Sequence, residues 1–280
     1  MNTVRAIASA SALLALSLPL VAQAETSAQV NPSILSTNNQ LTLFSQIQKV
    51  DYTENGGTYG SAPGPLDTEN GSISGGGVSL SFMEDAFLGN DYLYLSYKQA
   101  SGNIDYVGAY LGSGLPYGSL HSSSGASIKD FSIRYGKGFV TGANSLITPY
   151  LEFGHHRWDR TLTAFQEENY KHRYYGLGAN YQYAATDKLI LSANVMVGHT
   201  MSAEMDTNSA ELQSTSLGNA AIVRAGLGVD YAVSKKLHLS ATYNYETFKY
   251  GHSQLNGNGY YEPDSTTKYN QYTLGVGYAF

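Results

Sequence analysis

The sequence predicts an all-β fold, a transmembrane antiparallel up-and-down β-barrel of about ten strands, with eight as the alternative count. The last strand alternates strictly between apolar and small or polar residues, and the same pattern recurs upstream. After the first two dozen residues, no apolar run approaches the ~18 residues of a membrane helix. A barrel wall needs an apolar side chain only at every second position, so these features fit together.

The first 24 residues have the layout of a secretory signal peptide. Arg5 supplies a positive start, residues 10–21 form a short apolar stretch, and Ala22-Gln23-Ala24 is a small-residue cleavage site. We expect cleavage near Ala24 and export to the cell outer membrane. The expected organisation is a signal peptide over residues 1–24, a short periplasmic N-terminal tail over residues 25–39 and the barrel over residues 40–280.

The final strand carries a pattern that a soluble protein would not need. Its apolar face consists of Tyr272, Leu274, Val276, Tyr278 and Phe280. The other face carries Thr273, Gly275, Gly277 and Ala279. This pattern resembles the C-terminal signal of outer-membrane barrel proteins, and the resemblance implies that the strand closes the barrel and serves as a membrane-insertion signal.

The same strand pattern occurs in three internal copies, at residues 135–139, 175–181 and 225–231. A short polar turn follows each copy, so the repeated unit is a β-hairpin. Alternate glycines are expected to face a narrow lumen, which has little room for side chains. With their partners, the copies predict ten strands, at residues 40–53, 76–84, 92–107, 126–139, 146–159, 169–184, 188–203, 219–233, 237–250 and 267–280.

The first predicted strand alternates least clearly, and without it the count falls to eight or nine. Turns are short at one end of the strands, whereas connections such as residues 53–75, 111–125 and 251–266 at the other end are longer and polar. This asymmetry is typical of short periplasmic turns and long extracellular loops.

Alternation also predicts which charged side chains face the lumen. They are Lys98, Asp130, Arg134, Glu152, Arg224, Asp230 and Glu246. Pairing Phe139 with Ile147 would place Arg134 opposite Glu152, and pairing Tyr231 with Leu239 would place Arg224 opposite Glu246. Opposed Cβ atoms lie ~4.5–5.5 Å apart, within reach of an ion pair. Two interpretations stay open: a plug that stiffens a narrow barrel, which its small diameter favours, and the lining of a small pore.

Two histidines are expected to face each other at the outer rim of the lumen. The register about the loop centre sets His156 opposite His172, where two imidazoles could bind a metal or respond to pH. No further ligand has a fixed spacing to them, so we expect polar rim residues, no metal and no cofactor. The chain has no cysteine, which excludes disulfides and thiolate chemistry.

Other function classes are weighed against the sequence. The chain has a net charge of −6, and loss of Arg5 with the signal leaves 15 basic against 22 acidic residues, so nucleic acid is not an expected partner. His121 and Ser123 match the His-x-Ser pair of outer-membrane lipid hydrolases but fall in a predicted Gly/Ser loop. Omptin proteases need an Asp-x-His motif, which is missing here. We expect no enzyme, with a membrane-embedded lipid hydrolase as the alternative.

With its signal, Tyr-rich alternating strands and terminal Tyr278-Ala279-Phe280, the chain resembles the small Gram-negative outer-membrane β-barrel superfamily of opacity-type and porin-like surface proteins. The resemblance implies a porin-like or adhesin-like surface protein, and it implies no catalytic residues. It also implies contact with outer-membrane lipid, recognition of the last strand by the barrel-assembly machinery, and an extracellular ligand at the loops. Those families typically have eight strands, whereas this chain predicts ten.

Overall fold

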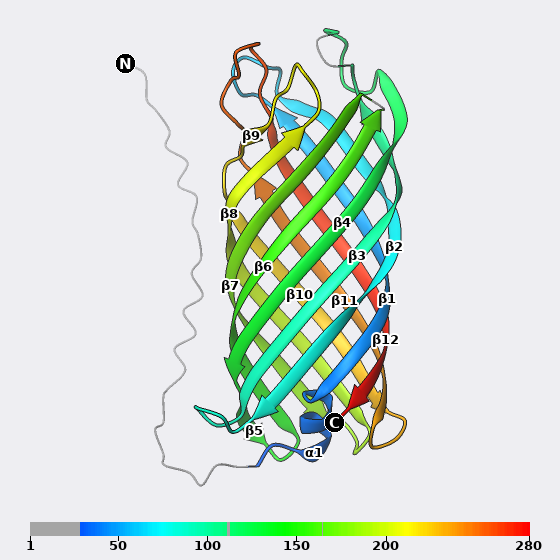
Figure 1. Ribbon diagram of the computed structural model, residues 1–280, viewed down its shortest axis with the longest axis vertical. Coiled ribbons are helices and arrows are strands. Elements are labelled where there is room, and N and C mark those ends of the chain that lie inside the picture. Colours follow the sequence, from blue (N-terminus) through cyan, green and yellow to red (C-terminus); the bar gives the residue numbers. More distant parts are fainter. Residues whose placement is uncertain (1–28, 111–112, 164) are drawn as a thin grey trace, which may run out of the picture.

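The computed structural model describes residues 29–110, 113–163 and 165–280, which form one closed antiparallel barrel (Figure 1). The predicted signal peptide and residues 25–28 lie outside the described residues. Short turns and the C-terminus lie at one end of the barrel, and the long loops lie at the other. No helix among the described residues has the length and apolar character needed to cross a bilayer.

Ten long strands build the wall, and two short strands, β5 and β9, add to it. The elements are α1 (Pro32–Thr37), β1 (Gln40–Gly56), β2 (Gly64–Glu84), β3 (Asp91–Gly108), β4 (Leu120–Lys137), β5 (Phe139–Gly142), β6 (Ser145–Thr163), β7 (Gln166–Ala184), β8 (Leu189–Thr207), β9 (Thr215–Ser216), β10 (Ala221–Ala232), β11 (Leu237–Tyr250) and β12 (Asp264–Ala279). This confirms the predicted fold and strand count.

The first strand closes the barrel. β1 pairs with β12 from Gln40 opposite Ala279 to Asn55 opposite Asp264, and it pairs with β2 on its other side. At the far side of the ring, β10 pairs with both β8 and β11. The strand with the weakest alternation is therefore a complete wall strand, because both neighbours satisfy its backbone hydrogen bonds.

The burial of side chains is inverted relative to a soluble protein, with large apolar residues on the outside. Leu177, Leu227 and Leu274 are each more than 60% exposed, whereas their neighbours along the strand point inward. Such a continuous apolar exterior is stable only against hydrocarbon. The outward set predicted for the last strand, Tyr272, Leu274, Val276, Tyr278 and Phe280, is exposed at 51–68%.

Two strands, β2 and β4, begin six or more residues earlier than the sequence predicts. β2 starts at Gly64 rather than at residue 76, because its glycines belong to the paired strand and not to a loop. A Cβ at Gly71 would lie 2.6 Å from Ile104 Cγ2, and one at Gly75 would lie 1.9 Å from the Gln99 carbonyl oxygen. Close approach between strands thus requires glycine there. β4 starts at Leu120, so His121 and Ser123 stand on a strand and not in the predicted loop.

The segment expected as a simple tail forms helix α1 at the short-turn end (Figure 1). Asn31 caps the helix by accepting a hydrogen bond from the Ser33 amide at 2.9 Å, and proline follows at the first helical position. Just after α1, the amides of Asn38 and Gln182 exchange two hydrogen bonds of 2.8 and 3.0 Å. The chain therefore enters the barrel mouth before it begins the first strand.

Candidate functional site

A network of two arginines and two glutamates crosses the middle of the lumen. Arg134 Nε donates to Glu152 Oε2 at 2.7 Å, and Arg224 Nη2 lies 2.5 Å from Glu246 Oε2. Both pairs occur in the predicted register, Arg134 opposite Glu152 and Arg224 opposite Glu246. All four side chains are largely buried, with 16% exposure or less.

A further contact joins the two pairs across the barrel. Arg224 Nη1 on β10 donates to Glu152 Oε1 on β6 at 2.6 Å, and the Tyr174 hydroxyl donates to the same oxygen at 2.7 Å. β6 and β10 are not neighbours in the sheet, so this bond crosses the lumen. Glycine makes room for the tyrosine, because a Cβ at Gly154 would lie 2.3 Å from the Tyr174 ring. The network holds opposite walls together.

Asp130 and Lys98 form a second cluster beside this network. Lys98 Nζ lies 3.5 Å from Asp130 Oδ2 and donates to Gln271 Oε1 at 2.7 Å. His156 Nδ1 lies 2.6 Å from the other oxygen of Asp130. Both charges predicted on these strands thus point into the lumen, and each has an oppositely charged or polar partner.

Asp230, also predicted as a lumen charge, lies apart from these clusters at the short-turn end. His238 Nδ1 is 2.5 Å from Asp230 Oδ1, and the Thr37 hydroxyl donates to the same oxygen at 3.2 Å. The Ser36 hydroxyl of α1 lies 3.0 Å from His238 Nε2. Asp230 therefore fastens the helix to the wall instead of joining the central network.

The two predicted rim histidines do face each other, but not at the rim. His156 and His172 are opposite in register, their ring centroids lie 4.9 Å apart, and each is 1% exposed. The strands continue past them toward the loops, to residues 163 and 166, so the pair is enclosed within the barrel. The described residues contain no group of three His, Asp or Glu side chains suited to a metal ion.

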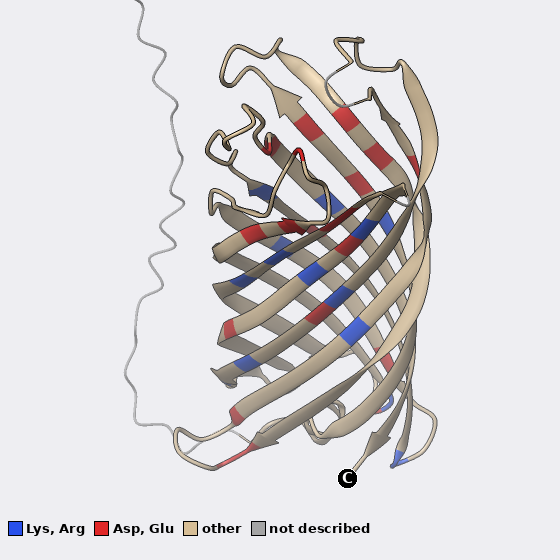
Figure 2. Ribbon diagram, turned by 45° about the horizontal axis from the view of Figure 1, so that its top comes forward, with Lys and Arg blue, Asp and Glu red and all other residues tan. Residues whose placement is uncertain are grey.

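Sequence reasoning missed the densest charge cluster, which surrounds Arg160 toward the long-loop end. Its guanidinium contacts four carboxylates on three strands, at 2.6–3.1 Å, and the arginine side chain is 1% exposed. Figure 2 shows acidic and basic positions on neighbouring strands in this part of the wall. The four partners are Glu54, Asp67, Glu69 and Glu168. Arg160 fell one residue beyond a predicted strand end, and Asp67 and Glu69 fell in a predicted loop.

A long loop, residues 251–263, is held over this cluster by a buried acid. The Tyr170 hydroxyl donates to the carboxyl group of Glu262, which is 5% exposed. Burial raises the pKa of Glu262 well above its usual range, and the nearby carboxylates of Glu54 and Glu168 raise it further. The docked loop therefore favours a protonated Glu262.

This gives a pH dependence with a definite sign. Docking is favoured fully below the pKa of a free glutamate, ~4.3, and weakens as pH rises through the raised pKa of the docked side chain. We expect proteolytic cleavage within residues 251–263 to be slower at pH 5 than at pH 8, and Glu262→Gln to abolish the difference. Glu211→Gln, which neutralises an exposed acid in a neighbouring loop, should preserve it. An unchanged pH profile in Glu262→Gln would contradict this account.

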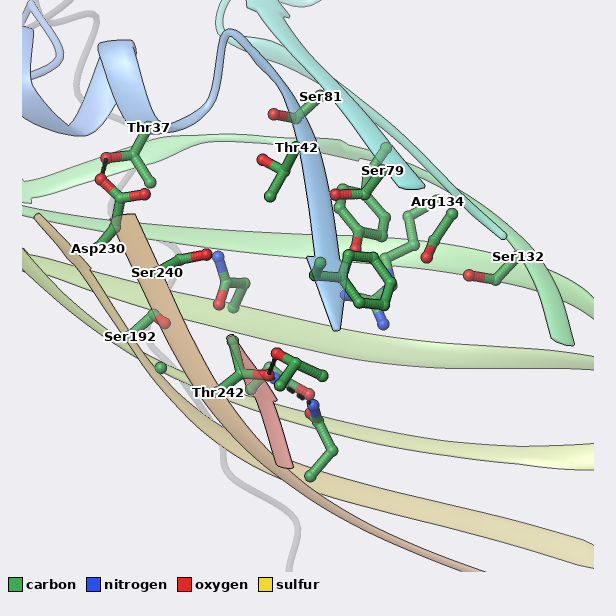
Figure 3. Close-up of a pocket in the computed structure, with 18 of the residues that line it drawn as sticks. Thr37, Thr42, Ser79, Ser81, Ser132, Arg134, Ser192, Asp230, Ser240 and Thr242 are labelled. Carbon is green, nitrogen blue, oxygen red and sulfur yellow. Dashed lines mark hydrogen bonds between the residues drawn. The ribbon is translucent and has the colours of Figure 1, made fainter. Parts of the chain in front are cut away.

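A polar cavity lies between α1 and the central network (Figure 3). Its volume is about 240 Å³, and hydroxyl groups of Ser79, Ser132, Ser192, Ser240 and Thr242 point toward it. Hydroxyl side chains can donate and accept, so the cavity suits water or a small neutral polar solute. Thr37 and Asp230 close it on the side of the helix.

The hydrolase alternative gains no support from the geometry of its residues. His121 and Ser123 are two residues apart on β4 and are both exposed. The Ser123 hydroxyl donates to the Ile104 carbonyl oxygen at 3.4 Å. A serine nucleophile needs a base within hydrogen-bond reach, and this hydroxyl is directed to the backbone of β3 instead.

Comparison with known proteins places this architecture. The sequence profile of the porin subfamily matches residues 31–276. Among solved structures, the outer-membrane protease OmpT from Escherichia coli superposes with a TM-score of 0.53 at 10% identity, covering 87% of this chain and 98% of that one. OprG from Pseudomonas aeruginosa gives 0.45 at 14% identity, covering 86% and 96%.

Ail, the attachment invasion locus protein of Yersinia pestis, has 14% identity and a TM-score of 0.35, with 87% of this chain and 99% of that chain covered. No curated protein matches the sequence. Identities this low speak for the fold alone, whereas the profile match extends from the residue before α1 into the last strand. The chain belongs to the porin subfamily of outer-membrane β-barrel proteins.

Proposed function

We propose that this protein is a non-enzymatic porin-type surface barrel whose lumen is closed to free diffusion at rest. The proposal rests on aromatic rings that meet across the lumen. Tyr52 on β1 and Trp158 on β6 have ring centroids 5.0 Å apart, and His156 on β6 lies 5.2 Å from Phe248 on β11. Neither pair of strands is adjacent in the sheet, so these contacts reach across the lumen, and all four rings are at most 2% exposed, as expected of close packing.

The layers on the periplasmic side of the aromatic rings suggest what would pass if the rings moved apart. The central network offers paired charges of both signs, and the cavity below it is lined with hydroxyl and amide groups. Such a lining favours small polar solutes over apolar ones. The aromatic contacts would then be the barrier, and α1 a second barrier at the periplasmic end.

Planar-bilayer recording tests the closed lumen. We expect the wild-type barrel to give no steady single-channel steps, because its aromatic layer is packed. Removal of both rings in Tyr52→Ala/Trp158→Ala should open a small, ion-conducting path. Phe153→Ala, which trims an exposed ring on the outer wall, should stay closed. A steady wild-type conductance as large as that of the double variant would overturn the proposal.

A second candidate function is adhesion through the extracellular loops. Large apolar side chains stand exposed there: Phe165 at 87%, Tyr110 at 64% and Leu115 at 53%. Exposed aromatic groups on loops favour contact with a partner surface. Substitution of these three residues by serine should lower adhesion of expressing cells to host cells or matrix. Unchanged adhesion, with normal surface display, would count against this role.

A further inference from the structure

A row of basic side chains crosses three neighbouring strands on the outer wall. Lys129 on β4 lies directly opposite Arg157 on β6, and Arg157 lies directly opposite Lys171 on β7. Their side chains are 37%, 47% and 29% exposed, so they point away from the lumen. Three cations therefore stand side by side on the face that carries the apolar belt.

This basic row lies immediately above the edge of the belt. Two residues closer to the periplasm on each strand, the outward residues opposite one another are Phe131, His155 and Arg173. Another two residues toward the periplasm, they are Ile133, Phe153 and Tyr175. Two residues of a strand span roughly 7 Å. The row thus stands at the height where hydrocarbon gives way to lipid headgroups, with aromatic rings directly beneath it.

Acidic neighbours pair with the row from its loop side and, through Glu204 opposite Lys171, at the level of the row itself. Asp159 lies 3.4 Å from Lys129 Nζ and 2.7 Å from Arg157 Nη2, while Lys171 Nζ is 3.2 Å from Glu204 and 2.5 Å from Asp206. Asp159 is two residues closer to the loops than Arg157, and Asp206 is opposite Asn169, which is likewise closer to the loops than Lys171. These carboxylates fix the cations in place and leave their membrane side open.

Arg173 adds a fourth cation at the lower edge of the row. Among the described residues it forms no ion pair, and it is exposed next to His155 and Tyr175. The four basic side chains thus have three acidic partners, Asp159, Glu204 and Asp206. The excess positive charge, that of Arg173, lies closest to the membrane. A guanidinium group presents two parallel N–H donors that match the geometry of a phosphate.

We propose that Lys129, Arg157, Lys171 and Arg173 bind the phosphate group of a phosphorylated lipid in the outer leaflet of the membrane. The phosphate would lie on the membrane side of the row, where Arg157 and Arg173 can both reach it, and the acyl chains would pack on Phe131 and Phe153 below. The aromatic edge argues for a lipid rather than a soluble phosphate, because a soluble anion would gain nothing from the rings.

The test compares a phosphorylated with a dephosphorylated lipid. Full-length folded barrel in detergent is mixed with lipid A that carries its phosphates or with the same lipid after their removal, and native mass spectrometry measures binding. We expect at least ten-fold preference for the phosphorylated lipid. Lys129→Gln/Arg157→Gln/Lys171→Gln should lose that preference. The matched triple Lys188→Gln/Lys235→Gln/Lys236→Gln, at the short-turn end, should keep it.

Arg173→Gln alone keeps the proposal testable if the triple variant does not fold, because this residue forms no ion pair within the part of the chain that the structure describes. It should weaken binding of the phosphorylated lipid several-fold and leave the dephosphorylated lipid unaffected. The proposal is overturned if wild type binds both lipids equally, if the control triple loses as much as the row triple, or if Arg173→Gln has no effect. Competition by inorganic pyrophosphate at concentrations equal to the lipid would show a soluble phosphate site instead.

Discussion

Arg160→Met is expected to destabilise the folded barrel by about 3–5 kcal/mol at neutral pH, the cost typical of removing one partner from a buried ionic cluster. Arg160 is the shared partner of four carboxylates, and two of them, Glu69 and Glu168, are 0% and 2% exposed in their side chains. Methionine fills a similar volume but leaves these oxygens without a positive charge. The expected loss of stability therefore comes from the unpaired carboxylates and not from a cavity in the lumen.

The measurement is urea unfolding of the barrel in lipid-free detergent, monitored by the gel shift between unheated and boiled protein. Arg157→Met is the matched control, since Arg157 lies three residues away on the same strand, pairs with Asp159 and is 47% exposed. Exposed pairs contribute roughly 0–1 kcal/mol. The Arg160 variant should also recover stability at low pH, where carboxylates lose their charge. Equal unfolding free energies for the two variants would contradict the account.

The wall of the barrel was predictable from sequence, because apolar residues alternate with small or polar residues along each strand and show which side chains face outward. Leu274 and Leu227 had to face outward once their glycine neighbours faced inward. The same logic placed Arg134 opposite Glu152, since a hairpin fixes the register of adjacent strands. The prediction was wrong at the start of β2, because Gly71 and Gly75 fall within the predicted connection over residues 53–75 but lie inside the strand, where neighbouring strands approach closely.

Contacts across the lumen could not be predicted in this way. The bond from Arg224 to Glu152 joins β10 to β6, and the bond from Arg160 to Asp67 joins β6 to β2. No alternation pattern specifies which side chains meet when a sheet closes, because that depends on strand tilt and on stagger around the ring. The predicted position of His156 and His172 at the outer rim was wrong because β6 and β7 extend beyond their predicted ends, which leaves the pair inside the barrel.

Glu152→Gln tests whether the central network acts as one unit, and we expect it to cost about 3–5 kcal/mol. Glu152 is 0% exposed and accepts hydrogen bonds from Arg134, Arg224 and Tyr174. Glutamine keeps the volume but removes the negative charge that two guanidinium groups share. It also turns an amide N–H toward at least one of those donors.

A double-mutant cycle separates pairing from packing. Arg134→Met and Glu152→Met each break the pair that lies across β4 and β6, whereas the double variant replaces it by two apolar side chains of similar volume. Because a buried ion pair exchanged for apolar groups is often neutral in stability, the double variant should be more stable than the sum of the single effects predicts. Both variants that replace Glu152 lose the bond from Arg224 to Glu152, so this loss cancels in the cycle, and neither member of the Arg224–Glu246 pair is substituted. Additive single effects would mean that Arg134 and Glu152 act independently, and the network would then be a set of separate contacts rather than a brace across the lumen.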